Sequence, residues 1–262
     1  MNCPKYPDLL VYVDGKFIPE VNVLNIIEPD GLFESLIFKE GKIFKLEEHL
    51  QRLYDGAKVI KIPLDKDKLI LAIHQTIKKN NLTNGYIRIS VFKSSLQIIV
   101  RPLPQYPEEI YTQGVSIITV PTRRHFIEST NPQVKSSNFA ANIMAKIEAT
   151  SHFEAIMFNE NGYVTEGTIS NIFVCKKGKL VTPPIYLGLL KGITRDFVIE
   201  LAQKEQIEVK EEPITRFDLY CSDEVFLTFT SAGIVPVIQI DGRIIGNGHP
   251  GILTQKLGGV LI

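Results

Sequence analysis

The chain has 262 residues, 44% of them hydrophobic, so it can bury a substantial core in one large domain or two smaller ones. Lys plus Arg and Asp plus Glu number 29 each, and without a net charge the chain has no general attraction to nucleic acid or to an anionic membrane. No signal-peptide pattern and no apolar run of membrane-spanning length occurs, so we expect a cytoplasmic protein. Cys3, Cys175 and Cys221 lie far apart without metal-ligand spacing, which predicts reduced structural thiols and no metal site.

Short strands and two amphipathic helices are predicted in the N-terminal part of the chain. Asp14-Gly15 and Gly41 supply turn residues for two hairpins. Hydrophobic residues then recur every three or four positions from Leu46 to Ile60, which predicts a helix whose apolar stripe leaves Arg52 on another face. The predicted strands are 10–13, 16–18, 36–38, 43–44, 86–91 and 96–100, and the predicted helices are 46–60 and 66–79. This mixture predicts an α+β domain over residues 1–110.

A proline-rich stretch separates this part from the rest of the chain. Three prolines within residues 101–107 predict an extended linker rather than a helix or a central strand. Beyond it, Asp241-Gly242 predicts a closing hairpin. The predicted strands are 115–120, 155–158, 169–174, 225–229 and 235–240, and the predicted helices are 138–149 and 194–203. We therefore expect a second domain over residues 111–262.

One predicted helix begins in a way that suits a phosphate group. Gly192-Ile193-Thr194-Arg195 directly precedes an apolar stripe, and the free N–H groups of a first helical turn attract anions. The hydroxyl of Thr194 can add a further donor. The segment lacks the spacing of a Walker loop, and an ordinary capped helix explains it equally well when it is taken alone.

Two further segments carry candidate catalytic groups. Glu166 precedes an apolar strand, where a carboxylate can pair with a protonated ring nitrogen; a turn with solvated polar groups is the alternative. Lys135 directly precedes a predicted helix, where partial desolvation would lower the pKa of its amine and let it form an imine with a carbonyl. Most lysines of a chain are solvated surface residues, so spacing alone leaves Lys135 undecided.

Hydroxyls and arginines elsewhere can contribute to the same chemistry. Thr230-Ser231 follows a predicted strand and can offer hydroxyls to a phosphate, to which Arg52 can add a bidentate charge. Strand alternation places Arg88 on the same face as Tyr86, where an arginine would suit a substrate carboxylate. Each of these residues also has a structural explanation. Thr230-Ser231 can form a turn, Arg52 can be a solvated helix residue, and Arg88 can be an exposed strand residue.

Taken together and in this order, these segments resemble the fold-type IV pyridoxal-phosphate enzymes. That family comprises the branched-chain aminotransferases, the D-amino-acid aminotransferases and the aminodeoxychorismate lyases. The matching segments are Asp30-Gly31-Leu32-Phe33-Glu34-Ser35, Glu48-His49-Leu50-Gln51-Arg52-Leu53, Lys135-Ser136-Ser137-Asn138, Glu166-Gly167-Thr168-Ile169-Ser170-Asn171, Gly192-Ile193-Thr194-Arg195 and Thr230-Ser231. The combination of these segments is specific to this family. The structural explanations given above for each single segment are therefore no longer favoured.

The resemblance implies a role for each matching residue. Lys135 would form the Schiff base with the cofactor and move the proton between the substrate Cα and the cofactor C4′, while Glu166 would contact the pyridine nitrogen. The remaining implied cofactor contacts are Arg52, Ser170, Asn171, Gly192, Ile193, Thr194, Thr230 and Ser231, and the implied substrate contacts are Phe33, Tyr86 and Arg88. The implied fold is an N-terminal α/β sandwich and a C-terminal pseudo-barrel domain with the cofactor between them, usually in a homodimer.

Three departures from the family pattern bear on the substrate. The segment from Asn25 to Gly31 is shortened, and Val91 to Leu96 joins two strands directly where many relatives have a long loop that helps to bind substrate. Phe139 stands closest to the position of a tyrosine that the branched-chain enzymes place near the cofactor. Tyr86-Ile87-Arg88 nevertheless resembles the branched-chain type, whereas Lys135 to Asn138 resembles the D-amino-acid and lyase types.

The leading hypothesis is an aminotransferase that moves an amino group between a branched-chain or D-amino acid and a 2-oxo acid in a ping-pong cycle. The alternative is an aminodeoxychorismate lyase that forms 4-aminobenzoate and pyruvate. A third hypothesis, a non-catalytic relative, is disfavoured because both Lys135 and Glu166 are present.

Overall fold

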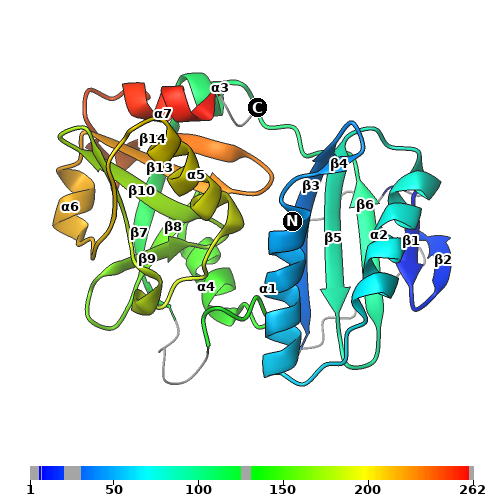
Figure 1. Ribbon diagram of the computed structural model, residues 1–262. Helices are drawn as coiled ribbons and strands as arrows, with labels where there is room; N and C mark the ends of the chain where they lie inside the picture. The colour runs from blue at the N-terminus through cyan, green and yellow to red at the C-terminus, as the bar shows by residue number, and fades with distance from the viewer. Residues whose placement is uncertain (1–5, 7, 21–30, 125–130, 260–262) are drawn as a thin grey trace. The chain divides into compact units, whose positions relative to one another are not determined.

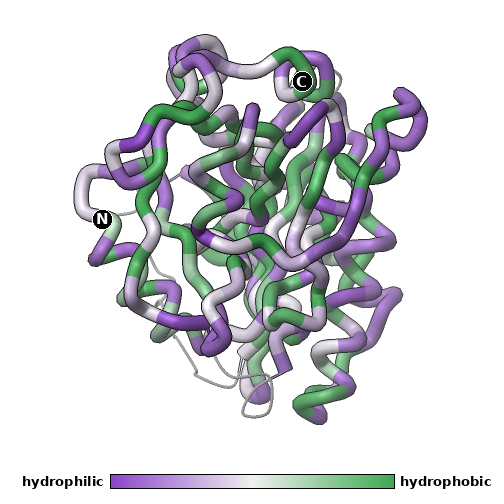
Figure 2. The backbone as a smooth tube through the Cα atoms, turned by 90° about the vertical axis from the view of Figure 1, so that its left-hand side faces the viewer, coloured by the Kyte–Doolittle hydropathy of each residue, from purple (hydrophilic) through white to green (hydrophobic). Residues whose placement is uncertain are grey.

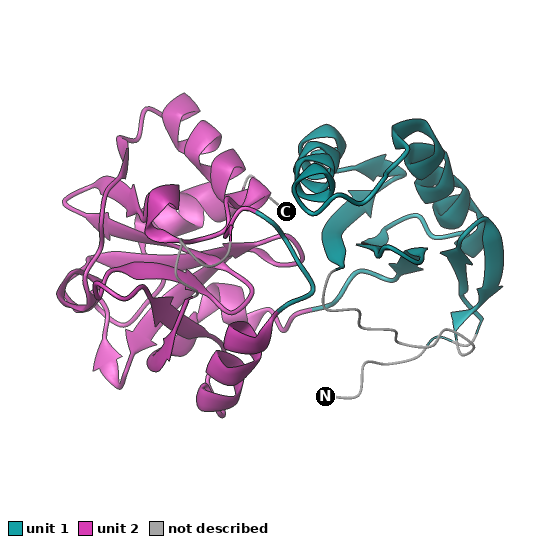
Figure 3. Cartoon of the chain, turned by 90° about the horizontal axis from the view of Figure 1, so that it is seen from below, with its two compact units in different colours: residues 1–105, 134–138 teal, residues 106–133, 139–262 magenta. Residues whose placement is uncertain are grey.

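A computed structural model of the protein describes residues 6, 8–20, 31–124 and 131–259, which form two compact units (Figure 3). Unit 1 comprises residues 1–105 and 134–138, and unit 2 comprises residues 106–133 and 139–262. The change of unit at residue 105 lies within the proline-rich stretch. Residues 134–138, which include Lys135, pack with unit 1, whereas the sequence grouped them with the second half. The predicted boundary between two domains at residue 110 stays a prediction. The two compact units are defined by their internal contacts, and these do not show whether each unit folds independently.

Unit 1 contains a six-stranded sheet in which every pair of neighbouring strands is antiparallel (Figure 1). The strand order is β2-β1-β6-β5-β3-β4. The strands are β1 (Leu10–Val13), β2 (Lys16–Pro19), β3 (Leu32–Lys39), β4 (Lys42–Ile43), β5 (Gly85–Val91) and β6 (Leu96–Arg101), and the helices are α1 (Leu46–Val59) and α2 (Lys66–Asn80). The predicted hairpins and both predicted helices are confirmed.

Both helices of unit 1 pack on the same hydrophobic core as alternate strand residues. Along β5, Ile87 and Ile89 are fully buried, while Tyr86, Arg88 and Ser90 are only partly buried. The predicted alternation is therefore confirmed. Burying each large aliphatic side chain contributes about 1.5–3 kcal/mol, so a one-residue slip that exposed this row would cost several kcal/mol. Burial thus fixes which strand residues point away from the helices.

Unit 2 contains a nine-stranded mixed sheet in the order β12-β11-β10-β13-β14-β7-β8-β9, with β15 paired to β14. Strand β7 runs parallel to both β14 and β8, and register shifts occur in the β14–β7, β7–β8 and β8–β9 pairs. Such irregularities bend a sheet, as expected for a curled half-barrel. The strands are β7 (Val115–Arg123), β8 (Ala155–Phe158), β9 (Val164–Gly167), β10 (Asn171–Lys176), β11 (Lys179–Thr182), β12 (Val209–Glu211), β13 (Glu224–Phe229), β14 (Gly233–Ile240) and β15 (Arg243–Ile244).

Helices cover the sheet of unit 2 where its strands are buried on both faces. One core cluster joins α5 and α7 to β10 and β13, and it includes the stacked rings of Phe173 and Phe226, whose centroids are 5.0 Å apart. The helices are α3 (Glu109–Thr112), α4 (Ala140–Glu148), α5 (Ile193–Lys204), α6 (Arg216–Tyr220) and α7 (Ile252–Gly258), with a 3₁₀ turn η2 at Ile185–Leu187. Figure 2 colours the backbone by the hydropathy of each residue, and hydrophobic (green) and hydrophilic (purple) stretches alternate along the tube.

In the part of the chain that the structure describes, no helix has both the length and the hydropathy needed to cross a membrane. Within the same residues, no group of three or more His, Cys, Asp or Glu side chains is arranged to hold a metal ion. Cys175 is buried and Cys221 is exposed, and both are free thiols. Cys3 lies outside the described residues.

Candidate active site

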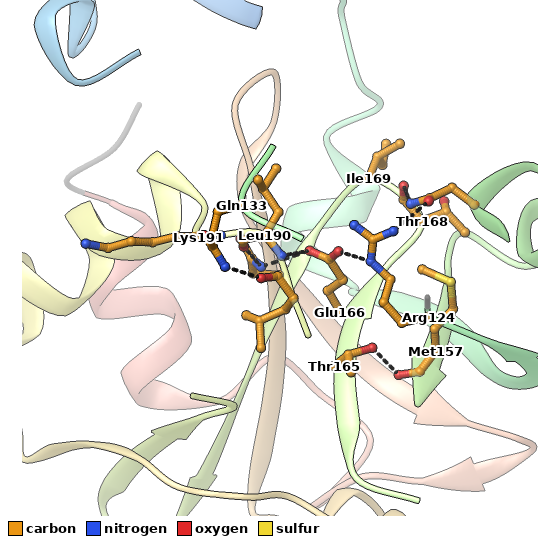
Figure 4. A network of polar contacts seen from close by, with 12 residues as sticks. Arg124, Gln133, Met157, Thr165, Glu166, Thr168, Ile169, Leu190 and Lys191 are labelled. Atoms are coloured by element: carbon orange, nitrogen blue, oxygen red, sulfur yellow. Dashed lines mark hydrogen bonds and ion pairs between the residues drawn. The ribbon is translucent and has the colours of Figure 1, made fainter. Parts of the chain in front are cut away.

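A buried carboxylate is the centre of the polar network in unit 2. Glu166 lies in β9 and is 6% exposed. Its Oε1 accepts a hydrogen bond from Nε of Arg124 at 2.7 Å, and its Oε2 accepts from the backbone N–H of Leu190 at 3.1 Å and from Nδ2 of Asn171 at 3.4 Å. Figure 4 shows Glu166 between Arg124 on one side and Leu190 on the other. The predicted acid is thus a buried, strongly oriented group and not a solvated turn residue.

Arg124 is a site residue that sequence reasoning missed. It directly follows β7, and its Nη1 also donates to Oδ1 of Asn142 on α4 at 3.3 Å. Nδ2 of Asn142 in turn donates to the carbonyl oxygen of Thr168 at 2.7 Å. A buried carboxylate is costly unless a positive charge and hydrogen bonds compensate it, and Arg124 supplies both. The sequence showed only an arginine near the end of a strand. Its distance along the chain from Glu166 gives no indication that the two side chains pair.

A second buried carboxylate holds the loop that follows Glu166. Glu154 is 2% exposed and accepts hydrogen bonds from Oγ1 of Thr168 at 2.5 Å and from Oγ of Ser170 at 2.9 Å. The backbone N–H groups of Ala155 and Ile169 also donate to it, at 2.9 and 3.2 Å. Because the hydroxyl hydrogen of Ser170 is directed to Glu154, this serine shapes the loop. Its direct contact with a cofactor stays a prediction.

The start of α5 lies close to Asn171. Gly192 is the N-cap of α5, and a Cβ built on it would stand 1.9 Å from Oδ1 of Asn171. The first turn of α5 contains Ile193 and the buried Thr194, and its N–H groups have no acceptor within the helix. A tightly packed glycine before such a turn lets an anion approach the backbone. The predicted helix start is thus present at Gly192 and Ile193, and its contact with a phosphate stays a prediction.

Strand β13 leads into the last predicted cofactor residues. Thr230 and Ser231 follow it directly, and Oγ of Ser231 lies 2.9 Å from the hydroxyl of Tyr106. Within β13, Thr228 is paired directly with Asn171 of β10, so the two side chains share one face of the sheet. The buried Oγ1 of Thr228 has no hydrogen-bond partner among the described residues. An unsatisfied hydroxyl beside Asn171 is consistent with a polar ligand at this face.

Arg52 is held by the buried Glu34 in unit 1, which also contacts the buried His49. Glu34, fully buried on β3, accepts from Nε of Arg52 at 2.6 Å and from Nη2 at 2.9 Å, and its Oε2 lies 2.8 Å from Nδ1 of His49. Burial alone would raise the pKa of Glu34, but the charge of Arg52 and the hydrogen bonds from His49 and Arg52 outweigh burial and lower it to about 2. The predicted phosphate contact of Arg52 stays a prediction; the structure gives the guanidinium a defined orientation.

The predicted substrate residues and Lys135 come together in unit 1. Lys135 Nζ lies 4.6 Å from the ring centroid of Phe33, and the guanidinium carbon of Arg88 lies 4.0 Å from the same centroid. The hydroxyl of Tyr86 lies 2.7 Å from Oγ of Ser35 on the neighbouring strand. Phe33, Arg88 and Lys135, selected from three separate motifs, therefore form one cluster, and Tyr86 lies on the same face of the sheet as Arg88.

The departures from the family pattern fall at three places in the structure. Phe92 donates its N–H to the carbonyl oxygen of Ser95 at 2.8 Å, which closes the short connection between β5 and β6 as a tight turn. Phe139 is the N-cap of α4. The shortened segment from Asn25 to Asp30 lies outside the described residues.

Each unit, taken by itself, carries groups that suit parts of pyridoxal phosphate. Unit 1 contains an amine, Lys135. Unit 2 contains a buried acid, Glu166, and a helix start with Thr194. The acid suits a protonated pyridine nitrogen, and the helix start suits a phosphate. The close approach at Gly192 and the unsatisfied hydroxyl of Thr228 are further observations that fit such a ligand.

Known proteins resemble this chain over nearly its whole length. The family model described as amino-transferase class IV matches residues 31–240. A Methanocaldococcus jannaschii protein named as a candidate branched-chain-amino-acid aminotransferase is 43% identical over 271 residues, which cover 94% of this chain and 93% of that protein. The crystal structure of the Escherichia coli branched-chain amino acid aminotransferase has a TM-score of 0.89 at 30% identity and covers 95% of this chain and 92% of its own.

A second solved structure is of a cofactor-bound enzyme. It is the branched-chain amino acid aminotransferase from Thermobaculum terrenum in its pyridoxal-phosphate holo form, which has a TM-score of 0.87 at 27% identity and covers 98% of this chain and 94% of its own. These matches confirm the α+β fold and the resemblance seen in the motifs. Together with the family match over residues 31–240, they show that this chain belongs to the class IV aminotransferases.

Proposed function

We propose that this aminotransferase moves the amino group between a branched-chain L-amino acid and a 2-oxo acid, with pyridoxal 5′-phosphate as its cofactor. The observation that carries the proposal is the buried Glu166, oriented by Arg124 and by the N–H of Leu190. The names of the M. jannaschii and E. coli relatives support the branched-chain substrate class. The cofactor supplies the electron sink that lets a proton leave the substrate Cα.

The residues of this chain divide the remaining tasks among them. We assign to Lys135 the covalent attachment of the cofactor and the movement of the proton at the substrate Cα. We assign to Glu166 the contact with the pyridine nitrogen, where a carboxylate keeps the proton on the ring. Thr194, the start of α5, Thr230, Ser231 and Arg52 are assigned to the phosphate, since they offer N–H groups, hydroxyls and one guanidinium.

The substrate is assigned to the uncovered face of the unit 1 sheet. Arg88 can bind a carboxylate with two parallel hydrogen bonds, and the hydroxyl of Tyr86, already bonded to Ser35, borders the same face. Phe33 and Ile37 lie on the same face of β3 as Ser35, two positions before it and two positions after it. Both offer apolar surface to an aliphatic side chain. This combination suits an amino acid with a hydrocarbon side chain better than one with a charged side chain.

We also propose a homodimer in the cytoplasm, as the family resemblance implies. Ile143, Met144 and Ile147 of α4 are each more than half exposed, and such a group of apolar side chains is costly in water. Sedimentation velocity over a range of protein concentrations would test the dimer. A monomer at all concentrations would contradict it.

The test of the proposed function uses the purified protein with pyridoxal phosphate. L-leucine, L-valine, L-isoleucine and D-alanine are each added as amino donor with 2-oxoglutarate as acceptor. L-glutamate is added with 4-methyl-2-oxopentanoate, the 2-oxo acid of leucine, as acceptor, and the products are measured by mass spectrometry. We expect transfer from the three branched-chain donors and from L-glutamate, and none from D-alanine. Transfer from D-alanine alone would replace the substrate class, and formation of 4-aminobenzoate from aminodeoxychorismate without any transamination would replace the reaction.

A further inference from the structure

The connection between η2 and α5 is held in place by side chains. Four of its backbone groups are hydrogen bonded to side chains, namely the carbonyl oxygen of Leu189, both groups of Leu190 and the N–H of Lys191. The N–H of Leu190 donates to Glu166 at 3.1 Å, and its carbonyl oxygen accepts from Nδ2 of Asn171 at 3.0 Å. The connection therefore supports the carboxylate of Glu166 on one side.

A single glutamine binds the other two backbone groups. Nε2 of Gln133 donates to the carbonyl oxygen of Leu189 at 2.8 Å. Oε1 of Gln133 accepts from the N–H of Lys191 at 3.1 Å (Figure 4). A carboxamide carries both donors and an acceptor, so it can satisfy the two groups at once. An ionised carboxylate, which only accepts, or an ammonium group, which only donates, could satisfy just one of them.

The two bonds of Gln133 constrain the side of the chain that faces Glu166. Gln133 binds groups of residues 189 and 191, whereas Glu166 and Asn171 bind the groups of Leu190 between them. In an extended backbone the N–H and C=O groups of successive residues point to alternate sides. Holding residues 189 and 191 on one side therefore directs the N–H of Leu190 to the other side, where Glu166 accepts it.

The backbone of Gln133 is anchored as well. Its N–H donates to Oδ1 of Asn131 at 3.0 Å, which closes an Asx turn, and the residue is half-buried. A long side chain loses much of its torsional freedom when its backbone is fixed at one end and its amide is bonded twice at the other. The amide of Gln133 thus has a defined place beside the connection.

We propose that Gln133 is a positioning residue that directs the N–H of Leu190 to Glu166 and thereby orients the carboxylate for the pyridine nitrogen of the cofactor. The inference rests on the proposed function, which assigns the contact with that nitrogen to Glu166. Leu190 and Arg124 bind different oxygens of the carboxylate. When the bond from Leu190 is lost, the carboxylate is free to turn, and a charged hydrogen bond weakens steeply as its angle departs from the ideal.

The first measurement follows the amide of Leu190 in the full-length, cofactor-free protein. Gln133→Met keeps the length of the side chain and removes both of its hydrogen bonds. We expect the Leu190 amide to exchange its hydrogen about tenfold faster than in the wild type, as measured by NMR of leucine-labelled protein. Gln203→Met, the same change at an exposed position of α5, should leave the rate unchanged. Equal rates in Gln133→Met and the wild type would overturn the proposal.

The second measurement separates the ring nitrogen from general packing. Pyridoxamine 5′-phosphate, which forms no covalent bond with Lys135, is compared with the analogue in which carbon replaces the ring nitrogen. The wild type should bind pyridoxamine 5′-phosphate more tightly, because only its ring nitrogen offers a hydrogen to Glu166. In Gln133→Met we expect this preference, the ratio of the two dissociation constants, to fall about 3- to 30-fold.

The outcomes of this comparison distinguish the inference from the proposed function. Gln133→Asn, whose amide is one carbon shorter and cannot reach both backbone groups, should show the same fall in preference. If the wild type prefers pyridoxamine 5′-phosphate and Gln133→Met keeps the same ratio, even with both affinities lowered, Gln133 acts on packing alone and only this inference fails. A wild type that binds the two compounds equally would refute the contact assigned to Glu166 in the proposed function.

Discussion

Arg124 donates its Nε hydrogen to Oε1 of Glu166 at 2.7 Å, across 42 positions of the chain. Glu166 is reached from the other side by Leu190, whose N–H donates to Oε2. The carboxylate is therefore oriented by two elements, the end of β7 and the segment before α5. Such double support is typical of groups that must not move during a reaction, because a small displacement weakens every contact made in the transition state.

Replacing Arg124 tests this support. Arg124→Gln removes the positive charge that compensates Glu166, and we expect kcat/KM for transamination to fall about 10- to 100-fold, the range for a lost charged hydrogen bond. Arg124→Lys keeps the charge without the planar guanidinium and should lose less. Steady-state kinetics with L-leucine and 2-oxoglutarate provide the measurement. Arg123, the neighbouring residue that lies over the ring of Phe158, is the control, and Arg123→Gln should retain most activity.

Lys135→Ala should remove the covalent attachment of the cofactor and the group that moves the substrate proton. We expect the absorption band of the lysine-bound cofactor to disappear and turnover to fall by several orders of magnitude, as happens when one member of a catalytic group is deleted. Lys68→Ala, at an exposed position of α2, is the matched control and should behave like the wild type. A Lys135→Ala protein with unchanged turnover would remove Lys135 from the mechanism.

Regular periodicity made much of the fold predictable from the sequence. The helix from Leu46 and the strand from Tyr86 to Val91 were predicted because their hydrophobic residues repeat at helical and strand spacing. Short helices such as α6 and α7 were not predicted, because five or seven residues contain too few repeats of the helical spacing of hydrophobic residues. Helix α6 did carry a readable signal, the capping box of Thr215 and Asp218.

The candidate site was predictable only where its residues stand in local motifs. Lys135 and Glu166 belong to such motifs, and the structure confirms that Glu166 is buried and hydrogen bonded. Arg124 and Glu154 were missed because their contacts with the Glu166 loop depend on how distant strands are brought together. No spacing in the sequence encodes that pairing. The burial of Glu34 could not be predicted from the sequence either, because its partner Arg52 lies 18 positions away on a helix.

Gly192→Ala tests the close approach between α5 and Asn171. A Cβ at position 192 would stand 1.9 Å from Oδ1 of Asn171, so the amide has to move and with it a contact of Glu166. We expect the affinity for pyridoxal phosphate to fall at least about tenfold, corresponding to about 1.4 kcal/mol. Fluorescence titration of cofactor-free protein measures it. Gly258→Ala is the control, because a Cβ at the end of α7 has nothing within 4 Å. Equal affinities of the two variants would show that the space at Gly192 is unimportant.

The two described cysteines should differ sharply in reactivity. Burial, aided by the charge of Glu224, raises the pKa of the Cys175 thiol to about 11, whereas Cys221 is exposed. Because the thiolate is the reactive form, iodoacetamide at pH 8 should modify Cys221 long before Cys175. Peptide mass spectrometry of samples taken over time measures both rates. In 8 M urea the two rates should converge, and equal rates in the folded protein would contradict the burial of Cys175.

The pairing of Glu34 with Arg52 and His49 should make the stability of unit 1 sensitive to acid. The pKa of Glu34 is lowered from 4.5 to about 2 in the folded protein, so the ionised carboxylate stabilises the fold fully above pH 4.5. As the pH falls from 4.5 towards 2, the unfolded chain binds a proton at this position and the folded chain does not, so about 3 kcal/mol is lost.

Urea unfolding at pH 6 and at pH 3, followed by the circular dichroism of the helices, measures about 2 kcal/mol of this loss, because pH 3 lies 1.5 units below 4.5. We expect Glu34→Gln to be less stable than the wild type at pH 6, because Arg52 and His49 lose their acceptor, and to lose less stability than the wild type between the two pH values. Asp65, an exposed residue at the start of α2, provides the control. Its pKa is lowered mainly by the backbone N–H of Lys68, and Asp65→Asn should leave most of the acid sensitivity in place. A Glu34→Gln protein with the same acid sensitivity as the wild type would show that the buried pair does not govern it.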